Sequence, residues 1–198
     1  MINLEENKKQ FIALYKEFIK RDGADQLLEW ISGTDFFEAP ASSNYHLAED
    51  GGLCQHSLNV FNRLNKILKT EYGDNYAEGF NGMETIAIVS LLHDLCKADY
   101  YVKELRNTKD DKGNWIQVPY YKVDERFHFG HGSKSVYIIQ NFMQLDLDEA
   151  SAIRFHMGGL EIPNTVEPNV TAVYNDYPLA LYTHLADMAA TYIDERKE

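Results

Sequence analysis

The sequence is poor in cysteine, poor in basic residues and free of long apolar runs. Only two cysteines occur in 198 residues, too few to hold a secreted fold together through disulfides, so we expect reduced thiols. No stretch approaches the roughly 20 apolar residues that a membrane-spanning helix needs. The first residues lack a basic segment followed by an apolar one. These absences favour a cytoplasmic protein that does not enter the membrane.

Positive charge is scarce as well. Nineteen lysines and arginines stand against 31 aspartates and glutamates, for a net charge of −12. Proteins that grip a long phosphate backbone carry the opposite excess, so long nucleic acids are disfavoured as partners. The length and the 44% hydrophobic content suffice for one substantial core. We expect one domain over residues 1–198, with the helices of 1–35 packed on a core of 36–195.

Apolar residues recur at helical spacing along most of the chain. The predicted helices cover residues 7–19, 27–31, 52–69, 83–96, 136–143, 147–157 and 178–193, with Ser133 as the cap of the fifth. Loops are expected at 36–44 and at 158–177. Within 100–124, two stretches rich in aromatic and β-branched residues flank a turn-rich run, which is typical of a β-hairpin. The pattern predicts a mainly α protein, a helical bundle with a small β-hairpin inserted at about 100–124.

Histidine stands out in this acidic chain, with seven residues. His93 and Asp94 close an apolar helical stretch, where burying an imidazole beside a carboxylate is costly without a compensating partner. His56 lies on the apolar stripe of the preceding helix, and Asp187 lies among small and apolar residues of the last one. Four ligand-type residues on buried helix faces favour a metal site over four independently satisfied polar groups.

This order of residues resembles the HD-domain superfamily of metal-dependent phosphohydrolases, whose signature is a His, a His-Asp pair and a distal Asp on separate helices. The resemblance covers about residues 36–193. Its most specific segments are 51–58 (GGLCQHSL), 91–97 (LLHDLCK) and 184–187 (HLAD). Segments 129–136 and 153–158 add His131 and His156, where two-metal members carry further ligands. An HD-type helical bundle is the fold that this resemblance implies.

The resemblance also implies the ligand sets. The first metal ion would take His56, His93, Asp94 and Asp187; the second would share Asp94 and add His131 and His156. Imidazole and carboxylate ligands without thiolate suit Mn, Fe, Co or Ni, with Mg also allowed. One ion or two are both compatible with the sequence. Such ions would lower the pKa of a bound water and clamp the oxygens of a phosphoryl group.

Three further side chains are candidates for substrate contact. Lys97 shares a helical face with His93 if that helix continues, and would pair with a phosphate and assist catalysis with Asp94; its alternative is a solvated lysine. Lys134 follows a glycine-rich helix start, where an anion can bind. His184, three residues before Asp187, suits either a contact near the site or a satisfied core histidine.

The remaining candidates have plainer interpretations. His46 and His128 are predicted as loop histidines near the mouth of the site rather than as ligands, and Arg154 as a surface residue. Cys54 and Cys96 flank His56 and His93 in sequence, and small core residues are predicted over a redox or ligand role. The basic and aromatic hairpin fits a flap that stacks on a substrate. It fits ordinary packing and solvation equally well.

The resemblance implies a hydrolase that cleaves a phosphomonoester or phosphodiester of a nucleotide or another small molecule. The branch that hydrolyses cyclic di-GMP has a His-His pair where this chain has His156-Met157, and a Gly-Tyr-Pro motif absent here, so that substrate is not transferred. A di-iron oxygenase and a non-catalytic nucleotide sensor are the alternatives. RNA cleavage ranks lowest, because the charge is strongly negative. A small phosphorylated substrate is expected, and homo-oligomerisation is left open.

Overall fold

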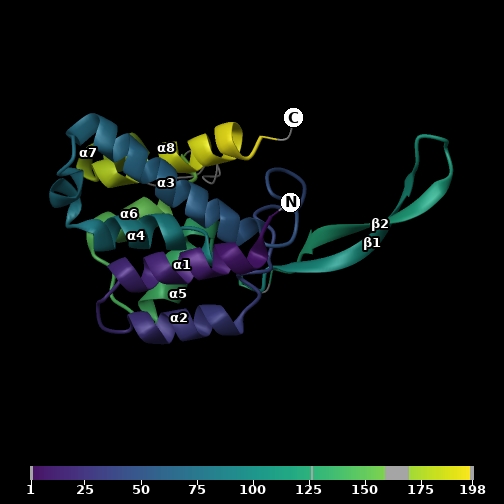
Figure 1. The fold of residues 1–198 in the computed structure, drawn as a ribbon, viewed down its shortest axis with the longest axis horizontal. Helices are drawn as coiled ribbons and strands as arrows, with labels where there is room; N and C mark the ends of the chain where they lie inside the picture. Colours follow the sequence, from purple (N-terminus) through teal and green to yellow (C-terminus); the bar gives the residue numbers. More distant parts are fainter. Residues whose placement is uncertain (1, 126, 159–169, 197–198) are drawn as a thin grey trace.

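The structure, a computed structural model, describes residues 2–125, 127–158 and 170–196. This part of the chain is mainly helical, with one two-stranded sheet (Figure 1). The α-helices are α1 (Leu4–Phe18), α2 (Ala24–Gly33), α3 (Gly52–Tyr72), α4 (Met83–Leu92), α5 (His131–Gln140), α6 (Leu147–Arg154), α7 (Val170–Asp176) and α8 (Pro178–Ala189). The strands are β1 (Tyr101–Lys109) and β2 (Trp115–Val123). Shorter elements are the 3₁₀ helices η1 (Tyr76–Phe80) and η2 (Leu95–Lys97) and the π-helix η4 (Ala190–Asp194).

Helix α4 lies at the centre of the bundle and packs against α1, α3 and α6. Every residue from Thr85 to Leu92 is buried, as expected for a helix that is apolar on all sides. Helix α8 packs against both α3 and α6. Helices α3, α4, α6 and α8 therefore pack together in one region. Among the described residues, no helix is long and apolar enough to cross a membrane.

A buried ion pair ties the connection between α1 and α2 to the centre of the bundle. The Arg21 guanidinium donates two hydrogen bonds of 2.6 Å to Glu149, which also completes the capping box at the start of α6. Thr85 of α4 donates a third, at 2.8 Å. Because the Glu149 side chain is fully buried, loss of Arg21 would leave a costly uncompensated carboxylate.

The β-hairpin is a separate ribbon. Its strands pair antiparallel from Tyr101 opposite Val123 to Lys109 opposite Trp115, and it projects away from the helical body (Figure 1). At its root, Lys103 and Tyr121 both bind Asp50, with Lys103 Nζ 2.6 Å from Asp50 Oδ1. The mainly helical fold with an inserted hairpin, as predicted from the sequence, is confirmed.

Two predicted helices are shorter than the sequence pattern indicates. Helix α4 ends at Leu92 instead of reaching residue 96, because His93 Nδ1 donates to the Ser90 carbonyl that the next helical turn would need. Helix α6 ends at Arg154 instead of residue 157, and just beyond this end His156 Nδ1 donates to Ile153 O. Both imidazoles are thereby fixed at helix ends.

The start of α5 is also different from the prediction. The helix begins at His131 instead of residue 136, so Ser133 lies in its first turn and Gly130 takes the cap position. Gly132 lets this first turn pack closely on α6, because a Cβ there would lie 2.4 Å from Arg154 O. Helix α7 occupies 170–176, where a loop was predicted. The rest of that predicted loop, 159–169, lies outside the described residues.

Candidate metal centre

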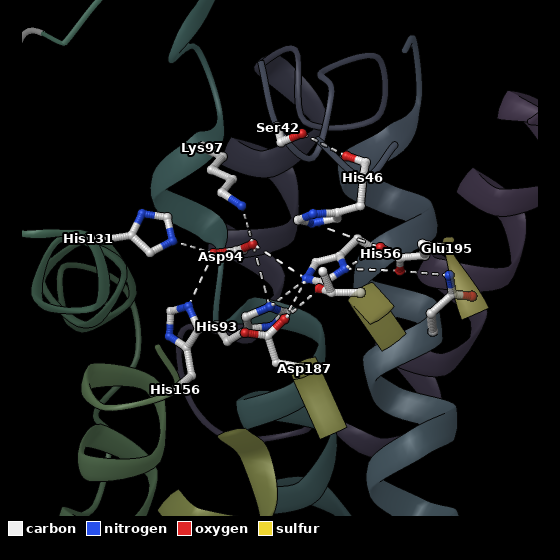
Figure 2. A network of polar contacts seen from close by, with 12 residues as sticks. Ser42, His46, His56, His93, Asp94, Lys97, His131, His156, Asp187 and Glu195 are labelled. Carbon is white, nitrogen blue, oxygen red and sulfur yellow. Dashed lines mark hydrogen bonds and ion pairs between the residues drawn. The ribbon is translucent and has the colours of Figure 1, made fainter. Parts of the chain in front are cut away.

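Six predicted ligands converge on one region of the bundle (Figure 2). They are His56 from α3, His93 and Asp94 from the turn after α4, His131 from the first turn of α5, His156 from the turn after α6, and Asp187 from α8. Five of them are buried and His131 is half-buried. The chain therefore assembles imidazoles and carboxylates where water has little access.

The first group surrounds His56 Nε2. This atom lies 3.2 Å from His93 Nε2, 3.2 Å from Asp187 Oδ1 and 3.6 Å from Asp94 Oδ2, and His93 Nε2 lies 3.5 Å from the same Asp94 oxygen. Ligand atoms that share one ion at about 2.1 Å lie roughly 3.0–3.4 Å apart. The spacing of this group is therefore close to what a single metal ion requires of its ligands.

The second group lies on the other side of the Asp94 carboxylate. Asp94 Oδ1 is 2.6 Å from His131 Nε2 and 3.4 Å from His156 Nε2. Asp94 thus turns one oxygen toward each group, in the manner of a carboxylate that bridges two positions (Figure 2). Each group could hold a metal ion.

All four imidazoles use their Nδ1 atom away from the centre. The contacts are His93 to Ser90 O (2.9 Å), His156 to Ile153 O (2.7 Å), His56 to Glu195 Oε1 (3.0 Å) and His131 to Cys96 Sγ (3.1 Å). A ring whose Nδ1 carries the proton presents the Nε2 lone pair as a ligand. The protein scaffold therefore orients Nε2 of each ring toward the centre.

The donor set fits a divalent metal ion. His156 Nε2 is buried and has no hydrogen-bond partner within the described residues, which is costly unless a cation or another group occupies the space it faces. The Nε2 atoms of His56 and His93 face each other at 3.2 Å. Nitrogen and carboxylate donors without a thiolate ligand match Mn, Fe, Co or Ni.

Without a cation the cluster redistributes protons. Burial lowers the pKa of His56, but its hydrogen bonds with Asp187 and Glu195 raise it overall to about 10. Burial lowers the pKa of His93 to about 3. The pKa of Asp94 lies well below its usual value despite burial, because Lys97 and the neighbouring imidazoles favour the carboxylate. The carboxylates of the cluster therefore favour a positive charge beside them.

Lys97 supplies part of that charge. Its Nζ lies 2.7 Å from Asp94 Oδ2, and Asp94 raises the lysine pKa above its usual value even though burial opposes this. The condition for a helical face shared with His93 is not met, because α4 ends at Leu92 and Lys97 lies in η2. Lys97 nevertheless lines the cavity beside the cluster.

That cavity has a volume of about 670 Å³. One end is formed by the ligand cluster, and the rest is largely apolar and aromatic, including Tyr45, Met157, Met188 and Tyr192. His184 also lines it, with Nδ1 donating to His156 O at 2.6 Å. A cavity of this size suits a small molecule with one polar end.

Lys134 lies elsewhere. Its Nζ is 3.0 Å from Glu125 Oε1 and 4.9 Å from the centre of the Tyr100 ring. It lines a separate hollow of about 360 Å³ together with His128, and His131 borders both spaces. The structure therefore does not bring Lys134 together with Lys97 and His184.

Glu195 is the residue that sequence reasoning missed. It stands in the charged run 194–198, which reads as a solvated tail, yet its side chain is 1% exposed and lies against His56. Cys96 was predicted as a core residue in preference to a redox or ligand role and is buried, but its Sγ also contacts His131. Chain spacing gives no sign of either contact.

His46 was predicted near the mouth of the site, and the structure places it directly beside His56 and Glu195. Its ring centre is 5.0 Å from that of His56, and its Nε2 is 3.8 Å from Glu195 Oε2. The Ser42 hydroxyl donates to His46 O at 2.8 Å. Gly52 lets this loop approach α3, because a Cβ there would lie 2.1 Å from Leu47 O.

Two minor predictions concern residues away from the ligands. Cys54 is buried in the core, as predicted. Arg154 is half-exposed, with its guanidinium 5.0 Å from the centre of the Phe155 ring. Neither side chain lines the cavity beside the ligand cluster.

Comparison of the chain with protein-family models, with curated proteins and with solved structures gave no match in any of the three. The nature of this centre therefore has to be argued from its own residues and their geometry.

Proposed function

We propose that the protein is a metal-dependent phosphohydrolase of the HD-domain type that hydrolyses a phosphoester of a small molecule such as a nucleotide. The observation that carries the proposal is the Asp94 carboxylate, with one oxygen facing His56 and His93 and the other facing His131 and His156. A bridging carboxylate between two imidazole groups suits two adjacent cations, which is the arrangement that phosphoryl transfer exploits.

The geometry supports the following ligand roles. The first ion would be held by His56, His93, Asp94 and Asp187, and the second by Asp94, His131 and His156. Mn, Fe, Co or Ni fit these donors, and Mg remains allowed. When bound, the ions would supply Lewis acidity and a water of lowered pKa.

The chain's own residues would do the rest. Lys97 lies at the cavity wall beside Asp94 and would offset phosphate charge as the P–O bond breaks. His184 would hold His156 in place through its hydrogen bond to the backbone. The apolar wall with Met157 and Met188 would hold the organic part of the substrate and exclude water.

The charges that line the cavity suit a substrate with one phosphate group better than a polyphosphate. Lys97 and Arg196 are the lysine and arginine side chains that line the cavity in the described residues, and Lys97 is already paired with Asp94. Each further phosphate would need its own counter-charge. We therefore expect monophosphates of nucleosides and related compounds to be better substrates than polyphosphates.

The test is phosphate release by protein freed of metal and then reloaded with Mn, Fe, Co, Ni or Mg in turn. The panel includes nucleotides, cyclic dinucleotides, sugar phosphates and model phosphodiesters. We expect turnover with at least one metal, and its loss in a His93→Ala/Asp94→Ala variant. His128→Ala is the matched control, because that histidine lies outside the cavity, and it should keep full activity.

Two outcomes contradict the proposal. Equal turnover in the His93→Ala/Asp94→Ala variant would place the activity elsewhere. Dioxygen consumption by the iron-loaded protein, without phosphate release from any substrate, would assign the same ligands to oxygenase chemistry instead.

A further inference from the structure

The β-hairpin arm (residues 101–123) has little support from the rest of the molecule. Its strands contact each other far more than they contact any helix, and it projects from the body (Figure 1). An isolated two-stranded ribbon is marginally stable in water. This one nevertheless exposes five large apolar side chains: Val102, Leu105, Trp115, Ile116 and Val123. By strand alternation Leu105, Trp115 and Val123 share one face of the ribbon, and apolar side chains exposed together on one face favour a contact with another molecule.

The arm also differs in charge from the rest of the chain. It contains five of the 19 basic residues but only three of the 31 acidic ones. Its net charge is therefore +2, and that of the other 175 residues is −14. A basic, apolar arm is complementary to an acidic partner, and the body of a second copy of this chain is strongly acidic.

An acidic groove lies at the root of the arm. It has a volume of about 550 Å³ and runs between the start of α1, the segment 35–40 and the first residues of the hairpin. Leu4 gives it apolar surface, Phe37 is buried at its wall with Lys8 Nζ 4.9 Å from the ring centre, and Glu5 and Glu38 are exposed carboxylates that line it. Such a groove suits an apolar side chain accompanied by a lysine.

The tip of the arm carries that combination. Trp115 is 71% exposed, and Lys109 Nζ lies 5.2 Å from the centre of its ring. Strand alternation puts both residues on the same face as Lys103 and Tyr121, which line the groove at the root. Tryptophan is among the residues most enriched at the energetic centres of protein interfaces.

We propose that two copies of this chain form a symmetric dimer through their hairpin arms. The two arms lie side by side in opposite directions, and each tip inserts Trp115 and Lys109 into the groove with Glu5 and Glu38 at the root of the other arm. Nine residues per strand give an arm of about 30 Å. A two-fold axis through the middle of the paired arms brings each tip to the opposite root, so the contact closes.

The test is the mass of the full-length protein in solution, measured by light scattering after gel filtration and by analytical ultracentrifugation. We expect a mass of twice 22.8 kDa. Trp115→Ser, Lys109→Glu and Glu38→Lys should each shift the protein to monomer. The double variant Lys109→Glu/Glu38→Lys should restore the dimer, because it exchanges the two charges. Lys66→Glu, the same charge change at an exposed position of α3, should leave the dimer intact.

Far-UV circular dichroism of each variant separates loss of the contact from loss of the fold. Wild-type protein that is monomeric at all concentrations would overturn the proposal, as would dimers that persist in the Trp115→Ser and Lys109→Glu variants. A labelled single-stranded RNA serves as the second probe. Tight binding of this RNA to monomeric protein at physiological salt, abolished by Lys109→Glu, would assign the arm to nucleic acid and overturn the dimer as well.

Discussion

Glu195 accepts a hydrogen bond of 3.0 Å from His56 Nδ1, across 139 positions of sequence. Asn59 of the same helix donates a second, at 2.8 Å to the same carboxylate oxygen. The carboxylate fixes the tautomer of His56 and raises its basicity toward whatever faces Nε2. The C-terminal end of the described chain, beyond α8, is therefore coupled directly to the candidate metal centre.

Loss of the Glu195 carboxylate should weaken metal binding without unfolding the protein. We expect Glu195→Ala to lower the affinity for Mn about 10–100-fold, and Glu195→Gln to have a smaller effect, because the amide oxygen still accepts the hydrogen bond. Titration calorimetry measures this. Asp194→Asn is the matched control, since that neighbouring carboxylate binds Arg63 on the surface instead. Unchanged affinity in Glu195→Ala would show that His56 needs no such support.

The number of ions should depend on His156. We expect two metal ions per chain in the wild type and one in His156→Ala, because the Nε2 atom of that ring faces Asp94 Oδ1, the oxygen of the second group, at 3.4 Å. The His56→Ala variant should lose the first ion instead. Elemental analysis of protein reloaded with Mn gives the stoichiometry, with His128→Ala as control. A wild type that binds a single ion would leave His156 without a ligand role.

Metal-free protein should lose stability as the pH rises from about 6.5 to 9. The pKa of His56 and that of His131 are each about 10 in the folded chain, against an ordinary 6.5. A raised folded-state pKa gives stability that is complete below 6.5 and is lost as the pH rises toward 10. Metal-loaded protein needs these rings neutral, so its stability should not fall over that range.

Thermal unfolding with a chelator and with Mn, at half-unit pH steps, shows whether the stability of each form falls as the pH rises. Metal affinity should rise over the same range, because binding displaces the protons of His56 and His131. A melting temperature of the metal-free protein that is flat or rising between pH 6.5 and 9 would mean that the rings are already neutral without metal.

Lys97 and Lys134 should behave differently. Lys97→Met should lower kcat/KM about 10²–10³-fold with the metal content retained, if that lysine stabilises the charge that develops on the phosphate. Lys134→Met should leave kcat/KM near the wild-type value, because its ammonium is held by Glu125 outside the cavity. Steady-state kinetics on the best substrate measures both. The reverse ranking would return Lys134 to the substrate site.

The sequence was sufficient for the mainly helical fold class and for the choice of His56, His93, Asp94 and Asp187 as candidate ligands, whereas His131 and His156 were added only by the family resemblance. Helical spacing located α1, α3, α4 and α8, and alternation around a turn-rich run located the hairpin, because these patterns follow from the geometry of helix and strand themselves. His56, Asp94 and Asp187 could be selected because each is a polar residue in a stretch that must be buried, and burial of such groups has a cost that calls for partners.

Helix ends and partners distant in sequence were decided only by the tertiary structure. His93 and His156 bind carbonyls of the preceding turn where their helices end, a contact that helix propensity does not register. Glu195 and Cys96 reach His56 and His131 because packing of α3, α5 and α8 brings them there. Periodicity reports which face of a segment is buried; which side chains then meet depends on how the helices pack in three dimensions.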